Sequence, residues 1–123
     1  MTTEEIGKKV VELTRKQAWR EAVDTLYSND IVSVEAQAMG DESPEKRGLE
    51  AVRGKTEWWV NTMNVYHIKV TGPFVAHDRF VVLYDIEFGE KTSAERIRMS
   101  EAGVYTVKDG KIVREEFLPQ VGD

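Results

Sequence analysis

Residues 79–117 read RFVVLYDIEFGEKTSAERIRMSEAGVYTVKDGKIVREEF, and their pattern decides the fold class. Apolar side chains recur at every second position, which is typical of strands with one buried face. The predicted strands cover residues 79–88, 93–107 and 111–118. Gly89-Glu90 and Asp109-Gly110 separate them, and an Asp-Gly pair between alternating segments is a strong hairpin signal. The stretch therefore predicts an antiparallel meander.

Two carboxylates fall on the apolar faces of these strands. The core face of the first strand is predicted to hold Phe80, Val82, Tyr84, Ile86 and Phe88. In the second strand Glu101 alternates in step with Met99, and in the third Glu115 alternates in step with Val113 and Phe117. Counting back from the hairpin pairs residue 107 with residue 112 and Glu101 with residue 118. The two glutamates are then diagonal neighbours.

A carboxylate on a core face has two interpretations. Its burial costs several kcal/mol unless it is hydrogen-bonded, paired or protonated. Glu101 and Glu115 are therefore either acid–base groups with a raised pKa in a cavity, or carboxylates bonded to a tyrosine, tryptophan or arginine or solvated at a rim. The sequence leaves both open.

The chain before this stretch is predicted to supply three helices. Thr2 and Glu5 have the spacing of a capping box, ahead of an apolar stripe of Ile6, Val10 and Leu13. The predicted helices cover residues 3–16, 18–27 and 49–63. Helices followed by a meander predict an α+β fold, with the helices packed on one face of a mostly antiparallel sheet.

Shorter segments complete the prediction. Ser28-Asn29-Asp30 is interpreted as the turn that ends the second helix, and Gly72-Pro73 as a turn between two strands. The remaining predicted strands cover residues 31–36, 65–71 and 74–76. Residues 37–48 are polar and contain Gly40, Pro44 and Gly48, so they are predicted to form a loop. We expect residues 1–123 to be one domain.

The composition excludes several kinds of site. The chain has 123 residues and no cysteine, so disulfides, zinc–cysteine sites and thiol nucleophiles are excluded. His67 and His77 are the only histidines, too few for a three-histidine metal site. No phosphate-cradling loop or dinucleotide fingerprint occurs. We predict neither a metal nor a cofactor.

The charge and hydropathy patterns limit the partners. The net charge of -5 argues against nucleic acid and anionic membranes as partners. The apolar segments are far shorter than the roughly 20 residues of a membrane helix. The first residues, MTTEE, are acidic, unlike a signal peptide. We expect a soluble, cytoplasmic protein.

Three motifs and their order resemble a known family. They are YSNDIVSVE at residues 27–35, GLEAVRG at 48–54 and VYTVKDGKIVREEF at 104–117. Together they are similar to the SnoaL-like branch of the nuclear transport factor 2-like superfamily. The resemblance implies a cone-shaped α+β barrel, in which a curved sheet wraps around three helices and an apolar pocket opens at the wide end. It also implies a homodimer through the outer sheet face, where residues 81, 83, 102 and 104 are apolar.

Ketosteroid isomerase, a member of that superfamily, suggests site residues. The resemblance places its general base on Glu35. Its protonated aspartate falls on or beside Gly103, so that acid is missing unless Glu101, one inward position earlier, replaces it. Its oxyanion tyrosine belongs near Val11, where this chain has no tyrosine. Steroid isomerisation by that set of residues is not expected.

Alternation and resemblance disagree about Glu35. By alternation Glu35 groups with Ile31 and Ser33, whereas residues 32, 34 and 36 form the more apolar face. Alternation therefore predicts that the Glu35 side chain is solvated, whereas the resemblance predicts that it points into the pocket.

Further side chains are predicted to contact a ligand. They are Tyr27, Trp59, Tyr84, Tyr105, Glu115 and His67. Each has a structural alternative: core packing for the tryptophan, satisfied core hydroxyls for the tyrosines and a surface position for the histidine.

Three functions remain open. The first is a cofactor-independent isomerase, cyclase, dehydratase or hydrolase acting on a small apolar organic molecule, with Glu101 and Glu35 as catalytic acid–base groups. The second is a non-catalytic ligand-binding module, and the third a dimeric interaction protein. The superfamily contains both enzymes and binding proteins, so the fold does not decide among them.

Overall fold

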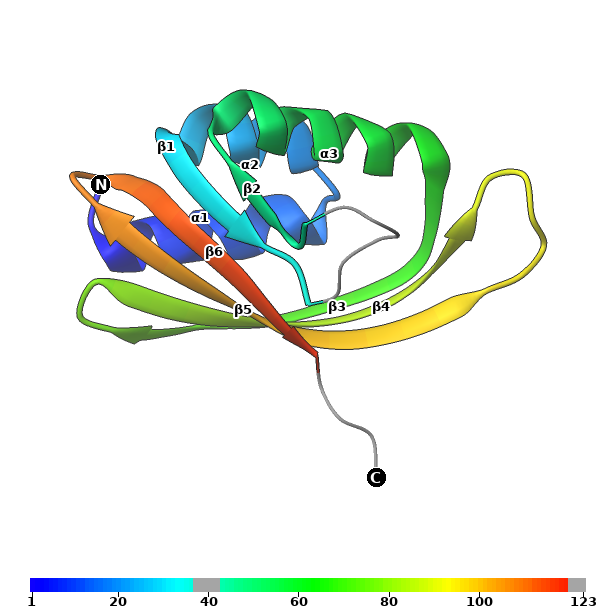
Figure 1. The fold of residues 1–123 in the computed structure, drawn as a ribbon. Helices are drawn as coiled ribbons and strands as arrows, with labels where there is room; N and C mark the ends of the chain where they lie inside the picture. The colour runs from blue at the N-terminus through cyan, green and yellow to red at the C-terminus, as the bar shows by residue number, and fades with distance from the viewer. Residues whose placement is uncertain (37–42, 120–123) are drawn as a thin grey trace.

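A computed structural model describes residues 1–36 and 43–119 of the chain, in which three helices pack against a six-stranded sheet (Figure 1). The helices are α1 (Thr3–Arg15), α2 (Trp19–Leu26) and α3 (Leu49–Thr62). The strands are β1 (Tyr27–Val34), β2 (Glu45–Arg47), β3 (Met63–Ala76), β4 (Arg79–Glu90), β5 (Ile97–Lys108) and β6 (Lys111–Pro119). The predicted α+β class is confirmed.

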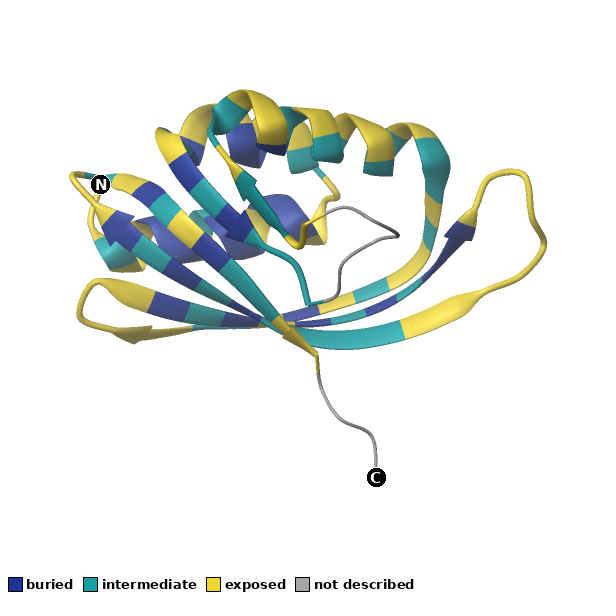
Figure 2. Cartoon of the chain, viewed as in Figure 1, coloured by how far each residue is buried: buried dark blue, intermediate teal, exposed yellow. Residues whose placement is uncertain are grey.

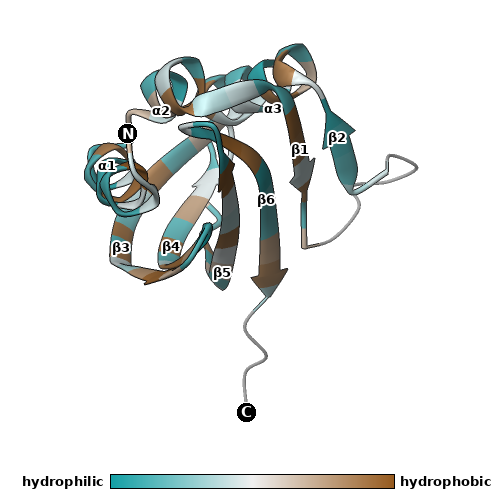
Figure 3. Cartoon of the chain, turned by 90° about the vertical axis from the view of Figure 1, so that its left-hand side faces the viewer, coloured by the Kyte–Doolittle hydropathy of each residue, from teal (hydrophilic) through white to brown (hydrophobic). Residues whose placement is uncertain are grey.

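The sheet is mixed, curved and open. Its strand order is β2-β1-β6-β5-β4-β3, and all neighbours are antiparallel except the parallel pair of β1 and β6. Viewed end on, the strands follow an arc with the helices on its inner side (Figure 3). This arrangement agrees with the predicted cone fold, although the sheet does not close into a barrel.

Local sequence signals account for the helices. Thr2 and Glu5 form the predicted capping box at the start of α1, and Ile6, Val10 and Leu13 are buried. The helix ends before Gln17, whose φ of 59° cannot continue it. The three observed helices lie within one residue of the predicted bounds at every end. None of the helices in the described part of the chain has the length and apolar character needed to cross a bilayer.

The core lies between the helices and the concave face of the sheet (Figure 2). Alternation in β4 predicted this face correctly, because Phe80, Val82, Tyr84, Ile86 and Phe88 are all buried. The outward side chains of the same strand are more accessible, and Leu83 is 44% exposed.

Two of the turns predicted from sequence were wrong, because the residues that suggested them lie inside strands. Ser28-Asn29-Asp30 belongs to β1, where the pairing with β6 shifts between Tyr27 and Val32. Gly72-Pro73 belongs to β3, where the pairing with β4 shifts between residues 71 and 74. In both places turn-type residues produce an irregularity in a strand.

The loop predicted at residues 37–48 is partly replaced by a strand. Residues 45–47 form β2 and pair with β1. Residues 37–42 of the predicted loop lie outside the described residues.

The β5–β6 hairpin follows the prediction up to a bulge. Val107 pairs with Ile112 as predicted, but the register shifts next to this pair, so Glu101 lies opposite Pro119. Ile112 is fully buried, whereas Val113, which was predicted to face inward, is the extra residue of the shift. The shift puts Ile112 and Glu115 on the same face although they are three residues apart.

Strand β1 reverses the expected faces. Ile31 and Ser33 are fully buried, whereas Val32 and Val34 are half-buried. The inward face is therefore the one that carries the serine, because Ser33 meets a polar partner in the interior.

Candidate functional site

A polar cluster lies inside the curved sheet and joins three parts of the fold. Strand β1 supplies Tyr27 and Ser33, and Glu35 follows directly after it. Strand β6 supplies Glu115, and helix α3 supplies Lys55. The parallel register places Ser33 opposite Glu115.

Glu115 is the buried centre of this cluster. Its side chain is nearly inaccessible, and its two oxygens have different partners. Tyr27 donates a short hydrogen bond to Oε1, and Ser33 Oγ donates to Oε2 over 2.6 Å. Of the two interpretations from sequence, Glu115 therefore has the hydrogen-bonded one. Burial raises the pKa of Tyr27 well above its ordinary value, and the charge of Glu115 adds to this effect, so Tyr27 remains a donor.

Lys55 reaches this cluster from α3. Its ammonium donates to Ser33 Oγ over 2.6 Å, forms a short ion pair with Glu35, and lies 3.5 Å from Glu115 Oε2. Burial lowers the pKa of Lys55, but the charges of Glu115 and Glu35 outweigh it, and the net pKa is raised. Lys55 is therefore cationic at neutral pH.

Lys55 was not predicted as a site residue. The sequence does contain a signal for it, because Lys55 follows the buried Val52 by three residues and precedes Trp59 by four. That spacing puts all three on one helical face. A lysine in line with core residues was the available clue.

Glu101 lies on the same concave face but has different surroundings. It pairs across the strands with Tyr84 and is half-buried. No hydrogen bond or ion pair links it to another described residue. Its pKa is raised to about 7, chiefly by burial and also by the negative charges of Glu35 and Glu115, while the charge of Lys55 acts in the opposite direction.

Two tyrosines form the polar floor beside Glu101. The hydroxyls of Tyr84 and Tyr105 lie 2.6 Å apart, and burial raises the pKa of both residues. Gly103 makes room for them, because a Cβ at this position would lie 2.9 Å from the Tyr105 ring. Where the resemblance places an aspartate, this chain has two phenol groups.

The remaining predicted site residues lie apart from the cluster or in the core. Trp59 packs on Phe88 with ring centroids 5.0 Å apart. His67 is exposed and pairs across the strands with Glu87, on the outer face of the sheet. Val11, which was not a predicted site residue but marks where the resemblance lacks an oxyanion tyrosine, is buried in the core. The structure thus brings together Glu35, Glu115 and Tyr27 with Lys55, and leaves His67 away from them.

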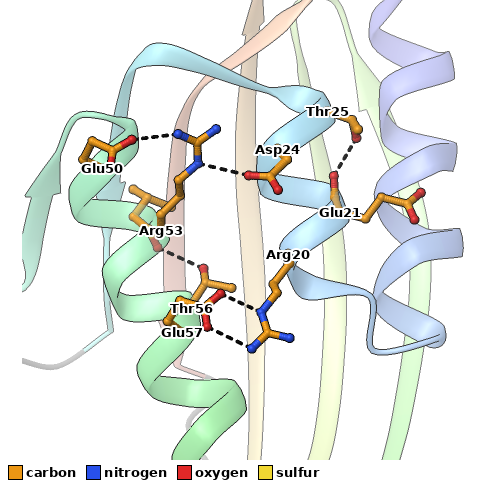
Figure 4. Close-up of polar contacts among 9 residues, drawn as sticks. Arg20, Glu21, Asp24, Thr25, Glu50, Arg53, Thr56 and Glu57 are labelled. Atoms are coloured by element: carbon orange, nitrogen blue, oxygen red, sulfur yellow. Dashed lines mark hydrogen bonds and ion pairs between the residues drawn. The ribbon is translucent and has the colours of Figure 1, made fainter.

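Ion pairs fix α3, the helix that carries Lys55, to α2 (Figure 4). Arg20 donates to both carboxylate oxygens of Glu57, over 2.6 and 2.8 Å. Arg53 bridges Asp24 of α2 and Glu50 of its own helix. These cross-links flank Lys55 by two residues on each side.

Two hollows in the described surface lie outside the polar cluster. One of about 410 Å³ lies between α1 and Gly72-Pro73, and one of about 260 Å³ lies between α2 and α3. The apolar pocket that the resemblance implies stays a prediction. Among residues 1–36 and 43–119, no group of three acidic or histidine side chains has the arrangement to hold a metal ion.

Solved structures resemble this fold closely. A candidate SnoaL-like polyketide cyclase from Mesorhizobium loti is 37% identical, with a TM-score of 0.85 over 95% of this chain and 98% of that one. A candidate isomerase from Bacillus subtilis is 13% identical, with a TM-score of 0.80 over 98% and 90% of the two chains. An epoxide hydrolase from M. tuberculosis is also 13% identical, with a TM-score of 0.69 over 96% and 82%. The last two likenesses establish a shared fold.

No curated protein matches the chain. A family model does match, and it covers residues 1–118 under the description "SnoaL-like domain". This match spans nearly the whole sequence and agrees with the fold and with the Mesorhizobium loti structure. The chain therefore belongs to the SnoaL-like family.

Proposed function

We propose that this protein binds a small organic molecule on the concave side of its sheet and that Glu101 exchanges a proton with it. The observation that carries the proposal is the position of Glu101. Its carboxyl group is half-buried opposite Tyr84 and has no hydrogen bond or ion pair with another described residue. A desolvated carboxyl group without a partner is available to a ligand.

The pKa of Glu101 suits proton transfer. At about 7, the carboxyl group is present in both protonated and ionised forms near neutral pH. Glu35 is the second acid–base group, because Lys55 contacts only one of its oxygens and its side chain is 38% exposed. An isomerisation, cyclisation, dehydration or hydrolysis by such a pair needs only proton transfers.

The charge of the site limits the ligand. Glu35, Glu101 and Glu115 face a single ammonium, that of Lys55, among the described residues. An anionic ligand would meet net repulsion, so a neutral or cationic molecule is favoured. The half-buried ring of Phe117, which packs on Tyr84 with ring centroids 6.5 Å apart, supplies apolar surface for its body. The Mesorhizobium loti relative is described as a polyketide cyclase, and this description is compatible with a neutral ligand that gives up a proton from carbon.

The test is a carboxyl-resolved NMR titration of the free protein. Glu101 is expected to titrate near pH 7, well above the value of about 4.3 for an unperturbed glutamate. Glu101→Gln should then retain binding of any ligand found by screening neutral and amine compounds but lose its conversion. A Glu101 midpoint near 4.3 would overturn the acid–base proposal and leave a binding module.

We also propose a homodimer through the outer face of the sheet. Leu83 and Leu118 are 44% and 47% exposed, and they lie in one row with Ala102 between them. Phe74, 54% exposed, pairs with Val81 in the next row. Such an apolar face is typical of an interaction surface. Light scattering should give twice the mass of one chain, and Leu83→Glu should halve it; a monomeric wild-type protein would refute the dimer.

A further inference from the structure

We infer that Lys55 is the positioning residue of the site: its ammonium holds Glu35 and Glu115 as its own counter-ions and leaves Glu101 as the carboxyl group that faces a ligand. This inference rests on the proposed function, since it explains why Glu101, alone of the three carboxylates, has no hydrogen bond or ion pair with another described residue. It gives a role to a residue that sequence reasoning did not single out.

The ammonium of Lys55 has no donor left for a ligand. An ammonium group has three N–H donors. One donates to Ser33 Oγ and one to Glu35 Oε1. The third is left for Glu115, whose Oε2 lies 3.5 Å from Lys55 Nζ. The Phe117 ring, with its centroid 5.4 Å from Nζ, covers part of the ammonium. Lys55 therefore acts through its carboxylate neighbours and does not contact a ligand directly.

Glu115 is already saturated by protein groups. Tyr27 occupies one oxygen, and Ser33 and Lys55 share the other. A carboxylate that is nearly inaccessible and bonded on both oxygens has no position free for a substrate proton. Glu115 is the anchor that keeps Lys55 in the interior.

Glu35 depends on Lys55 for its orientation. It follows the last residue of β1, and its backbone N–H donates to the carbonyl of Pro44 over 2.8 Å; among the described residues, the hydrogen bond of its side chain is the one from Lys55. The side chain is more than a third exposed, so solvent competes for it. The ion pair with Lys55 turns the carboxylate inward.

The electrostatic environment of Glu101 follows from this arrangement. The groups facing it are Tyr84 on β4, Glu115 on β6, Glu35 after β1 and Lys55 on α3. Lys55 is the single cation among these groups, and it lowers the pKa of Glu101 against the two carboxylates. Removing its charge leaves two negative neighbours, so the pKa of Glu101 must rise.

The experiment compares three variants by the same NMR titration. Lys55→Met should raise the midpoint of Glu101 by about one pH unit relative to the wild type. Lys55→Arg keeps the positive charge and should restore most of the wild-type midpoint. Lys69→Met is the matched control, because it removes a charge from the outer side of β3, opposite Asp85, and should leave Glu101 unchanged.

Each outcome decides the inference. A Glu101 midpoint that is raised in the wild type but identical in a folded Lys55→Met variant would overturn the role of Lys55 while leaving the proposed function intact. A wild-type midpoint near 4.3 would instead overturn the proposed function. If Lys55→Met does not fold, Glu35→Gln replaces it: removing this half-exposed negative charge should lower the Glu101 midpoint, and an unchanged midpoint overturns the inference.

Discussion

Ser33 and Glu115 lie directly opposite each other in the parallel pair of β1 and β6, and the serine hydroxyl donates a 2.6 Å hydrogen bond to the carboxylate. The pairing of β1 with β6 thus brings Ser33 and Glu115 into contact, because opposite residues on one face of a sheet lie side by side. Among the described residues, every buried side-chain nitrogen and oxygen has a hydrogen-bond partner. The interior around Glu115 is a complete network, and its members should be costly to remove.

The first prediction concerns this network. Glu115→Ala should lower the free energy of unfolding by about 3–5 kcal/mol, because it leaves Ser33 and Tyr27 without their buried acceptor and Lys55 with one ion pair fewer. Glu116→Ala is the control, since the next side chain points outward; it should change stability by less than about 0.5 kcal/mol. Urea unfolding at pH 7 measures both. Equal losses would mean that the network does not stabilise the fold.

The second prediction is a pH dependence of stability. Glu101 has a pKa of about 7 in the folded protein against 4.5 for the ordinary carboxyl group, so the folded state binds more protons between these values. Stability must therefore fall as pH rises from about 4.5 to 7, by on the order of 2 kcal/mol for this half-buried group. Unfolding curves across this window should show the decline in the wild type. The Glu101→Gln variant should lack this part of the decline. The prediction would be contradicted if the free energy of unfolding fell equally with pH in the two proteins.

The third prediction uses two glycines with opposite surroundings. A Cβ at Gly103 would lie 2.9 Å from the Tyr105 ring and 3.1 Å from the Tyr84 ring, so Gly103→Ala should displace the tyrosine pair and cost about 1–3 kcal/mol. A Cβ at Gly54 of α3 meets no atom within 4 Å, so Gly54→Ala should stabilise the protein by roughly 0.5–1 kcal/mol. Thermal unfolding gives the two signs, and near-ultraviolet circular dichroism reports on the tyrosines. Two effects of the same sign would refute the packing argument.

The fourth prediction concerns the ion pairs between α2 and α3. Arg20→Glu should lower the thermal midpoint, because it places two negative charges where the pair with Glu57 now lies. The double variant Arg20→Glu with Glu57→Arg should recover part of the loss by restoring opposite charges. Both effects should shrink in 1 M salt, since the groups are exposed and screened. Failure of the exchange to recover stability would show that the pair does not join the helices.

Most of the fold followed from regular patterns. Alternation in β4 located Phe80, Val82 and Tyr84 in the core, and the capping box located the start of α1. The failures came at irregular positions. Turn-type residues at 28–30 and 72–73 lie inside strands, because tertiary pairing tolerated an irregularity there. Periodicity carries no information about where a strand will shift its register.

The site was predictable only in part, for a related reason. Glu101 and Glu115 were found because a carboxylate interrupts an apolar face. Lys55 was missed although it shares a helical face with Val52 and Trp59, because a lysine is seldom buried and was therefore not considered as an inward residue. Contacts such as that of Tyr27 with Glu115 join residues 88 positions apart, and local sequence cannot predict such a separation.

The position of β6 in the sheet has a consequence for how the protein is made. Among the described strands it is the last in chain order, yet it lies third in the sheet, between β1 and β5. During synthesis Ser33 and Lys55 leave the ribosome well before Glu115, so the lysine has no buried counter-ion until residues 111–119 emerge. Long-range parallel pairing of this kind forms slowly, because loop closure must come first. The nascent chain therefore leaves the edges of β1 and β5 unpaired until residues 111–119 have emerged, and in this interval aggregation or chaperone binding competes with folding.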